Sequence, residues 1–200
     1  MRRWILLAAI GTLVIGLDQG TKFLALKHLT PALEGASGFF EQLTGFYSHE
    51  QHPCRGVSRS ECPVKTVVDG FWYWRYVENP GAAFGLLRSA DASLRVPFFF
   101  AISVAAIIFI ISYFRKLEEE QKLTMVALSL VFGGAVGNFI DRIHLNYVID
   151  FIDMFIGTYH WPTYNIADSA ISVGVGLLIL EWILEMVRGD AAKKQEAEVS

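Results

Sequence analysis

Charged side chains are scarce in this chain. Asp, Glu, Lys and Arg make up only 18% of the 200 residues, and the formal net charge is -3. The chain has no run of Lys and Arg, so neither a nucleic-acid partner nor a strongly acidic substrate is indicated. Apolar residues account for 53% of the sequence and the mean hydropathy is +0.39, outside the composition of ordinary soluble proteins. The composition therefore indicates a membrane protein.

The first apolar run lacks the feature that would make it a removable signal peptide. Arg2 and Arg3 precede it, but it continues through Asp18 and Lys22 without a small-x-small cleavage site. We therefore interpret it as an uncleaved helix. It is one of four segments that reach the roughly 20 apolar residues needed to cross a membrane. These segments are 4–26, 96–114, 123–140 and 166–187.

The cations predict how these spans are oriented. The short connection 115–122 carries three cations and both chain ends carry more, so the positive-inside rule predicts that all three are cytoplasmic. The connections 27–95 and 141–165 are then on the outer face. The aromatic stretch 71–76 is typical of an interfacial belt or a surface strand. We expect a single domain over 1–200: an all-α membrane protein with four transmembrane helices, both termini cytoplasmic, and a small outer-face subdomain that is β-rich or looped.

Small residues at a spacing of four predict close contacts between the spans. Gly133 and Gly137 form one such pair, and Ser172 and Gly176 form another. We interpret both pairs as packing features.

Only two cysteines are present, Cys54 and Cys62, and both lie in the outer segment 34–71. In an oxidising compartment they are expected to form a disulfide that closes a short surface loop. Zinc binding together with His49 and His52 is the alternative, although their crowded order differs from the usual paired spacing of zinc ligands.

Two aspartates at the ends of apolar runs, Asp150 and Asp168, are the candidate catalytic residues. Carboxylates at membrane depth are costly and usually serve chemistry, transport or pairing. Two carboxylates that share one proton can hydrolyse a peptide bond without a metal or a nucleophilic side chain, as in aspartic proteases. The alternative is that Asn165 and Asp168 only cap the last helix and that Asp150 faces water.

Other ionisable residues lie on the same helices. Asp18 and Lys22 are four apart, which predicts either a self-neutralising pair with Lys22 reaching the interface or a substrate-orienting pair. Asn138 and Asp141 are three apart and share a helix face. Arg142 follows them and can reach either an aspartate or a lipid phosphate.

Five sequence blocks resemble, in order, the motifs of the bacterial lipoprotein signal peptidases, or type II signal peptidases. The blocks are Asp18-Gln-Gly-Thr-Lys22, Asn79-Pro-Gly-Ala-Ala-Phe84-Gly85, Gly133-Gly-Ala-Val-Gly-Asn138-Phe-Ile-Asp141-Arg142, Val148-Ile-Asp150-Phe151 and Tyr164-Asn165-Ile-Ala-Asp168-Ser169. The resemblance implies a four-helix aspartic endopeptidase of the bacterial inner membrane with an outward-facing site. Its implied substrates are diacylglyceryl prolipoproteins, cut just before the lipid-bearing cysteine. We expect a monomer in contact with phospholipid, without a cofactor.

The resemblance also implies a role for each matching residue. Asp150 and Asp168 match the catalytic pair, while Asp153 is expected to be dispensable for catalysis. Gly81 belongs to a turn that either brings the Asn79 amide beside the substrate or is a plain loop turn. The residues that line or brace the site are Asp18, Lys22, Asn79, Asn138, Asp141, Arg142 and Asn165.

The sequence departs from the family pattern in two places. Tyr164 stands where Phe is more usual, and the outer segment 34–71 is longer than expected. Two other classes stay open. A proton-coupled transporter would carry its acids in the middle of spans. A metal-dependent lipid-headgroup transferase would gather Asp141, Asp150, Asp153 and Asp168 around Mg²⁺.

Overall fold

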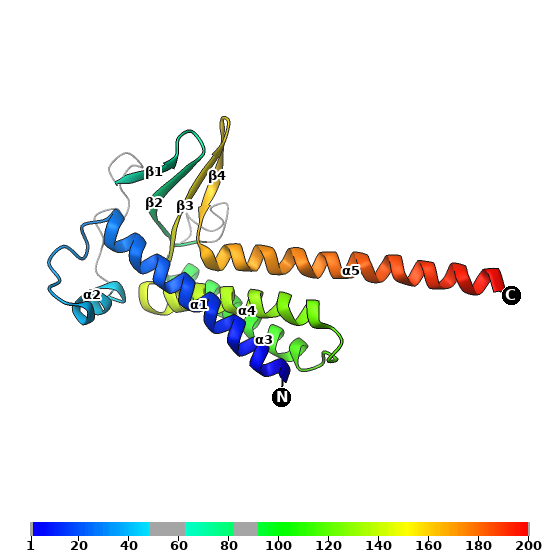
Figure 1. The fold of residues 1–200 in the computed structure, drawn as a ribbon. Helices are drawn as coiled ribbons and strands as arrows, with labels where there is room; N and C mark the ends of the chain where they lie inside the picture. Colours follow the sequence, from blue (N-terminus) through cyan, green and yellow to red (C-terminus); the bar gives the residue numbers. More distant parts are fainter. Residues whose placement is uncertain (1, 49–62, 82–91, 200) are drawn as a thin grey trace.

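The computed structural model describes residues 2–48, 63–81 and 92–199, and within these ranges the chain forms five helices and one four-stranded sheet (Figure 1). The helices are α1 (Arg2–Leu29), α2 (Phe39–Phe46), α3 (Ala92–Phe114), α4 (Lys122–Leu145) and α5 (Ile166–Val199). The strands are β1 (Val64–Val68), β2 (Trp72–Asn79), β3 (Val148–Ile156) and β4 (Tyr159–Tyr164). Cys54 and Cys62, with their expected disulfide, lie outside the described residues.

Among the described residues, four helical segments are long and apolar enough to cross a membrane. They are Arg2–Leu29, Val96–Phe114, Lys122–Leu145 and Ile166–Arg188, and each contains one of the sequence-predicted spans. Many of their apolar side chains are exposed, among them Leu17, Ile108 and Ile183. Such exposure is expected for helices surrounded by lipid, because apolar side chains in lipid do not carry the free-energy cost of contact with water.

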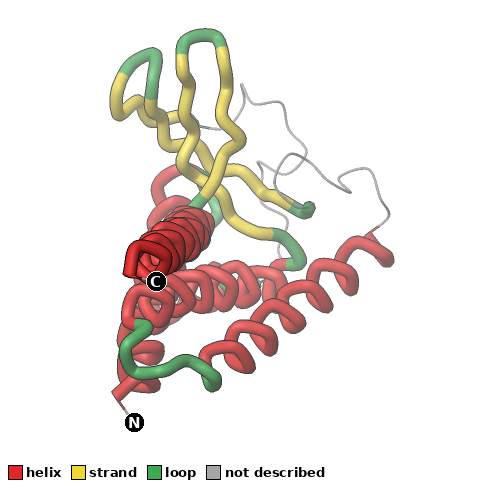
Figure 2. The backbone as a smooth tube through the Cα atoms, turned by 90° about the vertical axis from the view of Figure 1, so that its right-hand side faces the viewer, coloured by secondary structure: helices red, strands yellow, loops and turns green. Residues whose placement is uncertain are grey.

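The sheet lies at one end of the helices, and the chain termini lie at the other (Figure 1). In Figure 1 the N-terminus, the connection between α3 and α4 and the C-terminus lie toward one end of the helices, and the sheet and α2 lie toward the other. The turned view in Figure 2 shows the strands gathered on one side of the helices. Both chain ends therefore lie away from the sheet (Figure 1).

The sheet joins strands that are far apart in the sequence. Its order is β1-β2-β3-β4 with antiparallel neighbours, and β2 and β3 are separated along the chain by α3 and α4. In this pairing Val77 lies opposite Asp150 and Asn79 opposite Val148. The small subdomain is thus β-rich, and the aromatic stretch 71–76 is mostly strand β2. Tyr76 is buried, so it is not a belt residue.

The sheet is attached to the helices by a hydrophobic core. Leu26 of α1, Leu145 of α4, and Ile149 and Phe151 of β3 are all at most 3% exposed and belong to one cluster. Burying side chains of this size stabilises by about 1.5–3 kcal/mol each. The first residues of β3 are therefore held against the helices, which is where the candidate site lies.

Glycines let α4 approach its neighbours closely. A Cβ added at Gly133 would lie 2.7 Å from the Cβ of Val14, and one at Gly137 would lie 2.6 Å from Oδ2 of Asp18, which confirms this predicted pair. The prediction for Gly176 is wrong, because no atom lies within 4 Å of its added Cβ. Gly174 makes the close approach instead, since a Cβ added there would lie 2.6 Å from Cγ2 of Val131. The spacing of small residues identifies candidates but does not say which face of the helix meets a neighbour.

We predict that Gly134→Ala destabilises the helix packing and that Gly176→Ala does not. The new Cβ at 134 would press on the Ala167 carbonyl and lie 2.7 Å from Cγ1 of Ile171, and overpacking of this kind costs about 1–3 kcal/mol. The matched change at 176 meets open space, and replacing Gly by Ala within a helix is favourable by roughly 1 kcal/mol. Thermal unfolding in detergent measures both variants, and equal midpoints would contradict this packing.

Candidate active site

A buried lysine of α1 is held between two aspartates. Lys22 Nζ lies 2.8 Å from Oδ2 of Asp18 and 2.8 Å from Oδ2 of Asp141 on α4, and these side chains are at most 1% exposed. The self-neutralising pair is confirmed and includes a second aspartate. The expected reach of Lys22 to the interface is wrong, because its ammonium lies inside the protein and carboxylates replace water as its partners.

The two aspartates of this ion cluster (Asp18, Lys22 and Asp141) also bind backbone groups. Ala167 N–H in the first turn of α5 donates to Asp18 Oδ1 at 2.9 Å, and Ile149 N–H of β3 donates to Asp141 Oδ2 at 3.0 Å. Charge-assisted hydrogen bonds of this kind are about twice as strong as neutral ones. The cluster therefore fixes the start of α5 and the start of β3, the elements that carry Asp168 and Asp150.

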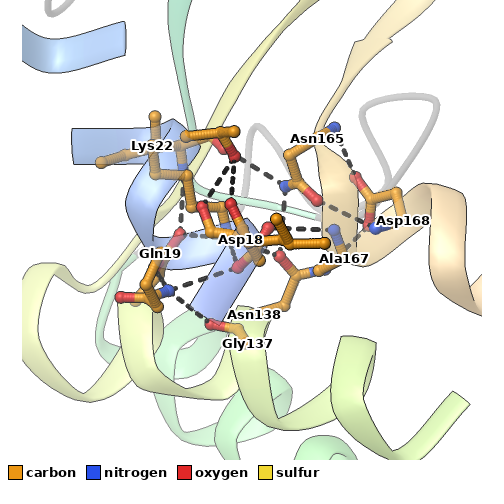
Figure 3. A network of polar contacts seen from close by, with 12 residues as sticks. Asp18, Gln19, Lys22, Gly137, Asn138, Asn165, Ala167 and Asp168 are labelled. Carbon is orange, nitrogen blue, oxygen red and sulfur yellow. Dashed lines mark hydrogen bonds and ion pairs between the residues drawn. The ribbon is translucent and has the colours of Figure 1, made fainter. Parts of the chain in front are cut away.

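Two asparagines connect the ion cluster with the candidate catalytic pair (Figure 3). Lys22 Nζ donates to Asn138 Oδ1 at 3.0 Å, and Asn138 Nδ2 donates to Asp168 Oδ1 at 2.8 Å. Asn165 Nδ2 donates to Asp150 Oδ1 at 2.8 Å and also lies 3.1 Å from Asn138 Oδ1. A continuous network thus links Lys22 to both carboxylates.

Asp150 lies on β3 and is only 2% exposed, so the alternative that it faces water is wrong. Its Oδ2 accepts a hydrogen bond from Asn79 Nδ2 at 3.0 Å. Gly81 N–H donates to Asn79 Oδ1 at 3.1 Å, which turns the amide nitrogen of Asn79 toward the carboxylate. Burial, followed by the negative charge of Asp168, raises the pKa of Asp150 well above its ordinary value.

Asp168 lies in the first turn of α5 and takes part in a helix cap. Its N–H donates to Asn165 Oδ1 at 2.9 Å, and its Oδ2 accepts the Asn165 N–H at 3.4 Å, the reciprocal pattern of a capping box. The capping alternative is therefore correct as a description of the helix. It does not exclude a chemical role, because Oδ1 of the same carboxylate binds Asn138.

Arg142 lies at the edge of this network. Its Nη1 donates to the Asn138 carbonyl at 3.2 Å, one turn earlier on α4, and its guanidinium lies 5.6 Å from the centre of the Phe99 ring. The positive charge of Arg142 favours ionised carboxylates nearby, since opposite charges at short range stabilise each other. Of the predicted site residues, all but Cys54 and Cys62 thus lie within the described ranges.

Asp153 belongs to a separate cluster within the sheet. It is fully buried on β3, and it binds Arg75 of β2 at 2.8 Å and His160 of β4 at 2.5 Å. Thr163 also donates to it at 3.2 Å. Asp153 therefore holds three strands together, and its partners differ from those of Asp150.

The four carboxylates proposed for a Mg²⁺ site do not form one cluster. Among the described residues, no group of three or more His, Cys, Asp or Glu side chains lies close enough to hold a metal ion. Asp141 is engaged with Lys22 and Asp153 with Arg75. This geometry does not favour the metal-dependent transferase.

Several contributors to the site were not predicted from the sequence. Gln19 Nε2 donates to Asp141 Oδ1 at 2.8 Å and to the Gly137 carbonyl at 3.1 Å. Its position inside the first-helix motif is the signal that could have identified it. The backbone donors Ile149 and Ala167 carry no such signal, because every residue except proline has an N–H group.

The fold and the site together define a multi-pass membrane protein with two interacting carboxylates where its helices meet its sheet. The sequence profile of the family described as signal peptidase (SPase) II matches residues 10–184, so this chain belongs to the signal peptidase II family, the bacterial lipoprotein signal peptidases. Family members are proteases that take part in lipoprotein processing, and the apolar helices fit a protein of the bacterial inner membrane.

Similar proteins agree with this assignment. The lipoprotein signal peptidase of Anaeromyxobacter sp. (strain Fw109-5) is 42% identical, and the match covers 98% of this chain and 91% of that protein. That of Syntrophus aciditrophicus (strain SB) is 38% identical, with 90% and 92% covered. A bacterial membrane enzyme solved by the in meso method is similar in structure, with a TM-score of 0.64, 28% identity, and 90% of this chain and 88% of that chain covered.

We predict that Asp153→Asn weakens the sheet at neutral pH and that this penalty disappears in acid. Burial alone would raise the pKa of Asp153, but hydrogen bonds and charges from His160 and Arg75 outweigh burial and lower it. A lowered pKa means that ionised Asp153 stabilises the fold fully above the unfolded value of about 3.9. This contribution is lost as the pH falls through the folded pKa.

The measurement is the difference in unfolding free energy between wild type and Asp153→Asn in detergent, at pH values from about 6 to about 3. The difference should shrink toward the acid end. A difference that stays constant over this range would contradict the ion pairing of Asp153. Cleavage by the folded variant at neutral pH should persist.

Proposed function

We propose that this protein is an aspartic endopeptidase in which Asp150 and Asp168 form the catalytic pair. It removes the signal peptide from diacylglyceryl-modified prolipoproteins and cuts just before the lipid-bearing cysteine. The observation that carries the proposal is that two carboxylates from different elements are joined through the amides of Asn138 and Asn165. Burial, followed by the negative charge of Asp168, raises the pKa of Asp150.

Burial supports a division of roles within the pair. Two carboxylates that interact in a poorly solvated place do not both ionise readily, so one proton is held between them. The raised pKa of Asp150 favours its protonated form, so we assign the shared proton to Asp150. Burial disfavours the charged form of Asp168 as well, but the hydrogen bond from Asn138 Nδ2 at 2.8 Å and the nearby cation Arg142 oppose that effect, so we assign the ionised role to Asp168.

This arrangement supplies an acid and a base for hydrolysis. Asp168 takes a proton from a water molecule, whose oxygen attacks the carbonyl carbon of the scissile bond. Asp150 gives its proton to the carbonyl oxygen, which produces a tetrahedral diol. Asp168 then gives its proton to the amide nitrogen, Asp150 takes a proton from a hydroxyl of the diol as the carbon–nitrogen bond breaks, and the two products leave with one proton again on Asp150.

The position of the pair suits a substrate that stays in the membrane. Asp150 and Asp168 belong to the end of the molecule where the sheet meets the helices, which we propose is the outer side. A signal helix and a diacyl chain both partition into lipid, so the scissile bond is near the outer interface without extraction. Water reaches the pair from the outer side, and phospholipid surrounds the spans.

The first prediction from this proposal concerns topology. Reporter fusions after Lys122 and at the C-terminus should report the cytoplasm, because cations cluster at those places. Fusions near Ser60 and Tyr159 should report the outer side. A cytoplasmic signal at Ser60 or Tyr159 would reverse the proposed face of the active site.

The second prediction concerns the pair itself. Asp150→Asn and Asp168→Asn each keep the shape of the side chain but remove one titrating group, so cleavage should fall by about 10²- to 10⁴-fold in both. The unfolding midpoint of Asp168→Asn should change little, since an amide in place of a carboxylate near a helix end costs about 1 kcal/mol or less. Mass spectrometry of a diacylated prolipoprotein incubated with purified protein measures the cleavage.

Two controls separate the proposed mechanism from a nonspecific effect of charge removal and from metal catalysis. Asp69→Asn makes the same chemical change at an exposed residue in the turn between β1 and β2, and it should leave cleavage unchanged. Addition of a chelator should also leave cleavage unchanged, whereas a Mg²⁺-dependent enzyme would lose activity. Either pair variant processing substrate near the wild-type rate while folded would refute the aspartic mechanism.

A further inference from the structure

Helix α2, within the long outer segment, folds back along the outer half of α1. Lys27 Nζ of α1 donates to Gln42 Oε1 at 3.0 Å. Closer to the middle of α1, the Phe23 ring packs edge-on against Phe46 at 5.6 Å between ring centres. Phe46 is only 1% exposed. The end of α2 is therefore anchored beside the helix that carries Asp18 and Lys22.

Tyr47, immediately after α2, contacts both α1 and α4. Its hydroxyl donates to Gln19 Oε1 at 3.0 Å, and its ring lies 4.9 Å from the ring of His144 on α4. Burial, together with the nearby charges of Asp141 and Asp18, raises the pKa of Tyr47. The hydroxyl therefore keeps its proton and acts as a donor over the working pH range.

The Gln19 amide can take only one orientation in these surroundings. Its nitrogen faces three acceptors: Asp141 Oδ1 at 2.8 Å, the Gly137 carbonyl at 3.1 Å and Asp18 Oδ2 at 3.3 Å. Reversing the amide would place its oxygen against two carboxylates. The hydroxyl of Tyr47 binds the amide oxygen and completes the only arrangement that satisfies both ends.

The contact continues from Asp141 to the candidate catalytic residue. Gln19 holds Oδ1 of Asp141, while Oδ2 binds Lys22 and the N–H of Ile149. Ile149 directly precedes Asp150, and its carbonyl accepts a hydrogen bond from Asn165 Nδ2 at 3.2 Å. A shift of the Asp141 carboxylate would therefore move the start of β3, and small displacements of reacting groups lower rates strongly.

From these contacts we propose that Gln19 and Tyr47 are positioning residues of this peptidase, which orient Asp141 and through it the backbone that carries Asp150. The inference rests on the proposed catalytic role of Asp150 and Asp168. Neither Gln19 nor Tyr47 touches the reacting atoms. The inference also assigns a role in positioning the active site to the end of α2, which lies in the long outer segment.

Purified Tyr47→Phe, Gln19→Leu and the double variant test this inference by steady-state cleavage of a synthetic diacylated prolipopeptide in detergent. Tyr47→Phe removes only a hydroxyl and should lower kcat about 3- to 10-fold with KM nearly unchanged, while Gln19→Leu should lower kcat about 10- to 100-fold. Because Tyr47 acts through Gln19, the double variant should be no slower than Gln19→Leu alone.

The matched control is Tyr73→Phe, which removes a hydroxyl that binds Gly70 and Asp69 in the turn between β1 and β2. It should retain wild-type kcat and KM. A wild-type kcat for Tyr47→Phe, or losses that multiply in the double variant, would overturn the positioning role. If Gln19→Leu does not fold, Tyr47→Phe alone decides the matter.

Asp150→Asn and Asp168→Asn are assayed in parallel so that the two proposals fail separately. Loss of cleavage in both, with full activity in Tyr47→Phe and Gln19→Leu, would reject only the positioning role. Full activity in either pair variant would reject the catalytic pair on which the inference rests.

Discussion

One buried ammonium group holds the parts of this protein together. Lys22 is fully buried, and it binds Asp18, Asp141 and Asn138 within 3.0 Å. A buried charge is tolerated only when its partners replace the lost water, so these side chains have little freedom to move. Each aspartate also accepts a hydrogen bond from the backbone of another element: Asp18 from the start of α5 and Asp141 from β3. The position of α1, α4, α5 and β3 thus depends on a single cation. Such a cluster adds less to stability than its number of contacts suggests, but it specifies one arrangement.

The candidate site itself is built from neutral amides around two acids. Asn79, Asn138 and Asn165 each donate to a carboxylate at 2.8 to 3.0 Å. An amide fixes the direction of a carboxylate without contributing a charge of its own, so it leaves the repulsion between the two acids in place. Burial, together with that repulsion, raises the pKa of Asp150. A lysine or arginine in the place of Asn165 would offset the repulsion between the two acids with its own positive charge.

The sequence predicts the features of the structure that depend only on a short segment of the chain. Each predicted span falls inside a helix because hydropathy over about 20 residues is a property of the segment alone. The candidate aspartates and Lys22 stand out because charged groups in apolar sequence are costly, and the other candidate site residues come from the resemblance to the family motifs. The pairing of β2 with β3 could not be predicted, since the strands are separated by two spans and their register depends on tertiary packing. The burial of Lys22 was missed for a related reason: a long side chain can reach outward or inward, and only the position of Asp141 on another helix decides.

The site depends on a sheet that is held against the bundle at one end. Asp150 and Asn79 come from the sheet, while Asp168 and Asn138 come from helices. The two halves meet because Ile149 and Phe151, on either side of Asp150 along β3, are buried in the core beneath the sheet. In a strand, residues next to each other point to opposite faces, so anchoring these two neighbours turns Asp150 to the other face. The hydrophobic core of the sheet therefore has a direct consequence for the chemistry. A substitution that loosens Ile149 or Phe151 would separate the two carboxylates even though neither residue can exchange a proton.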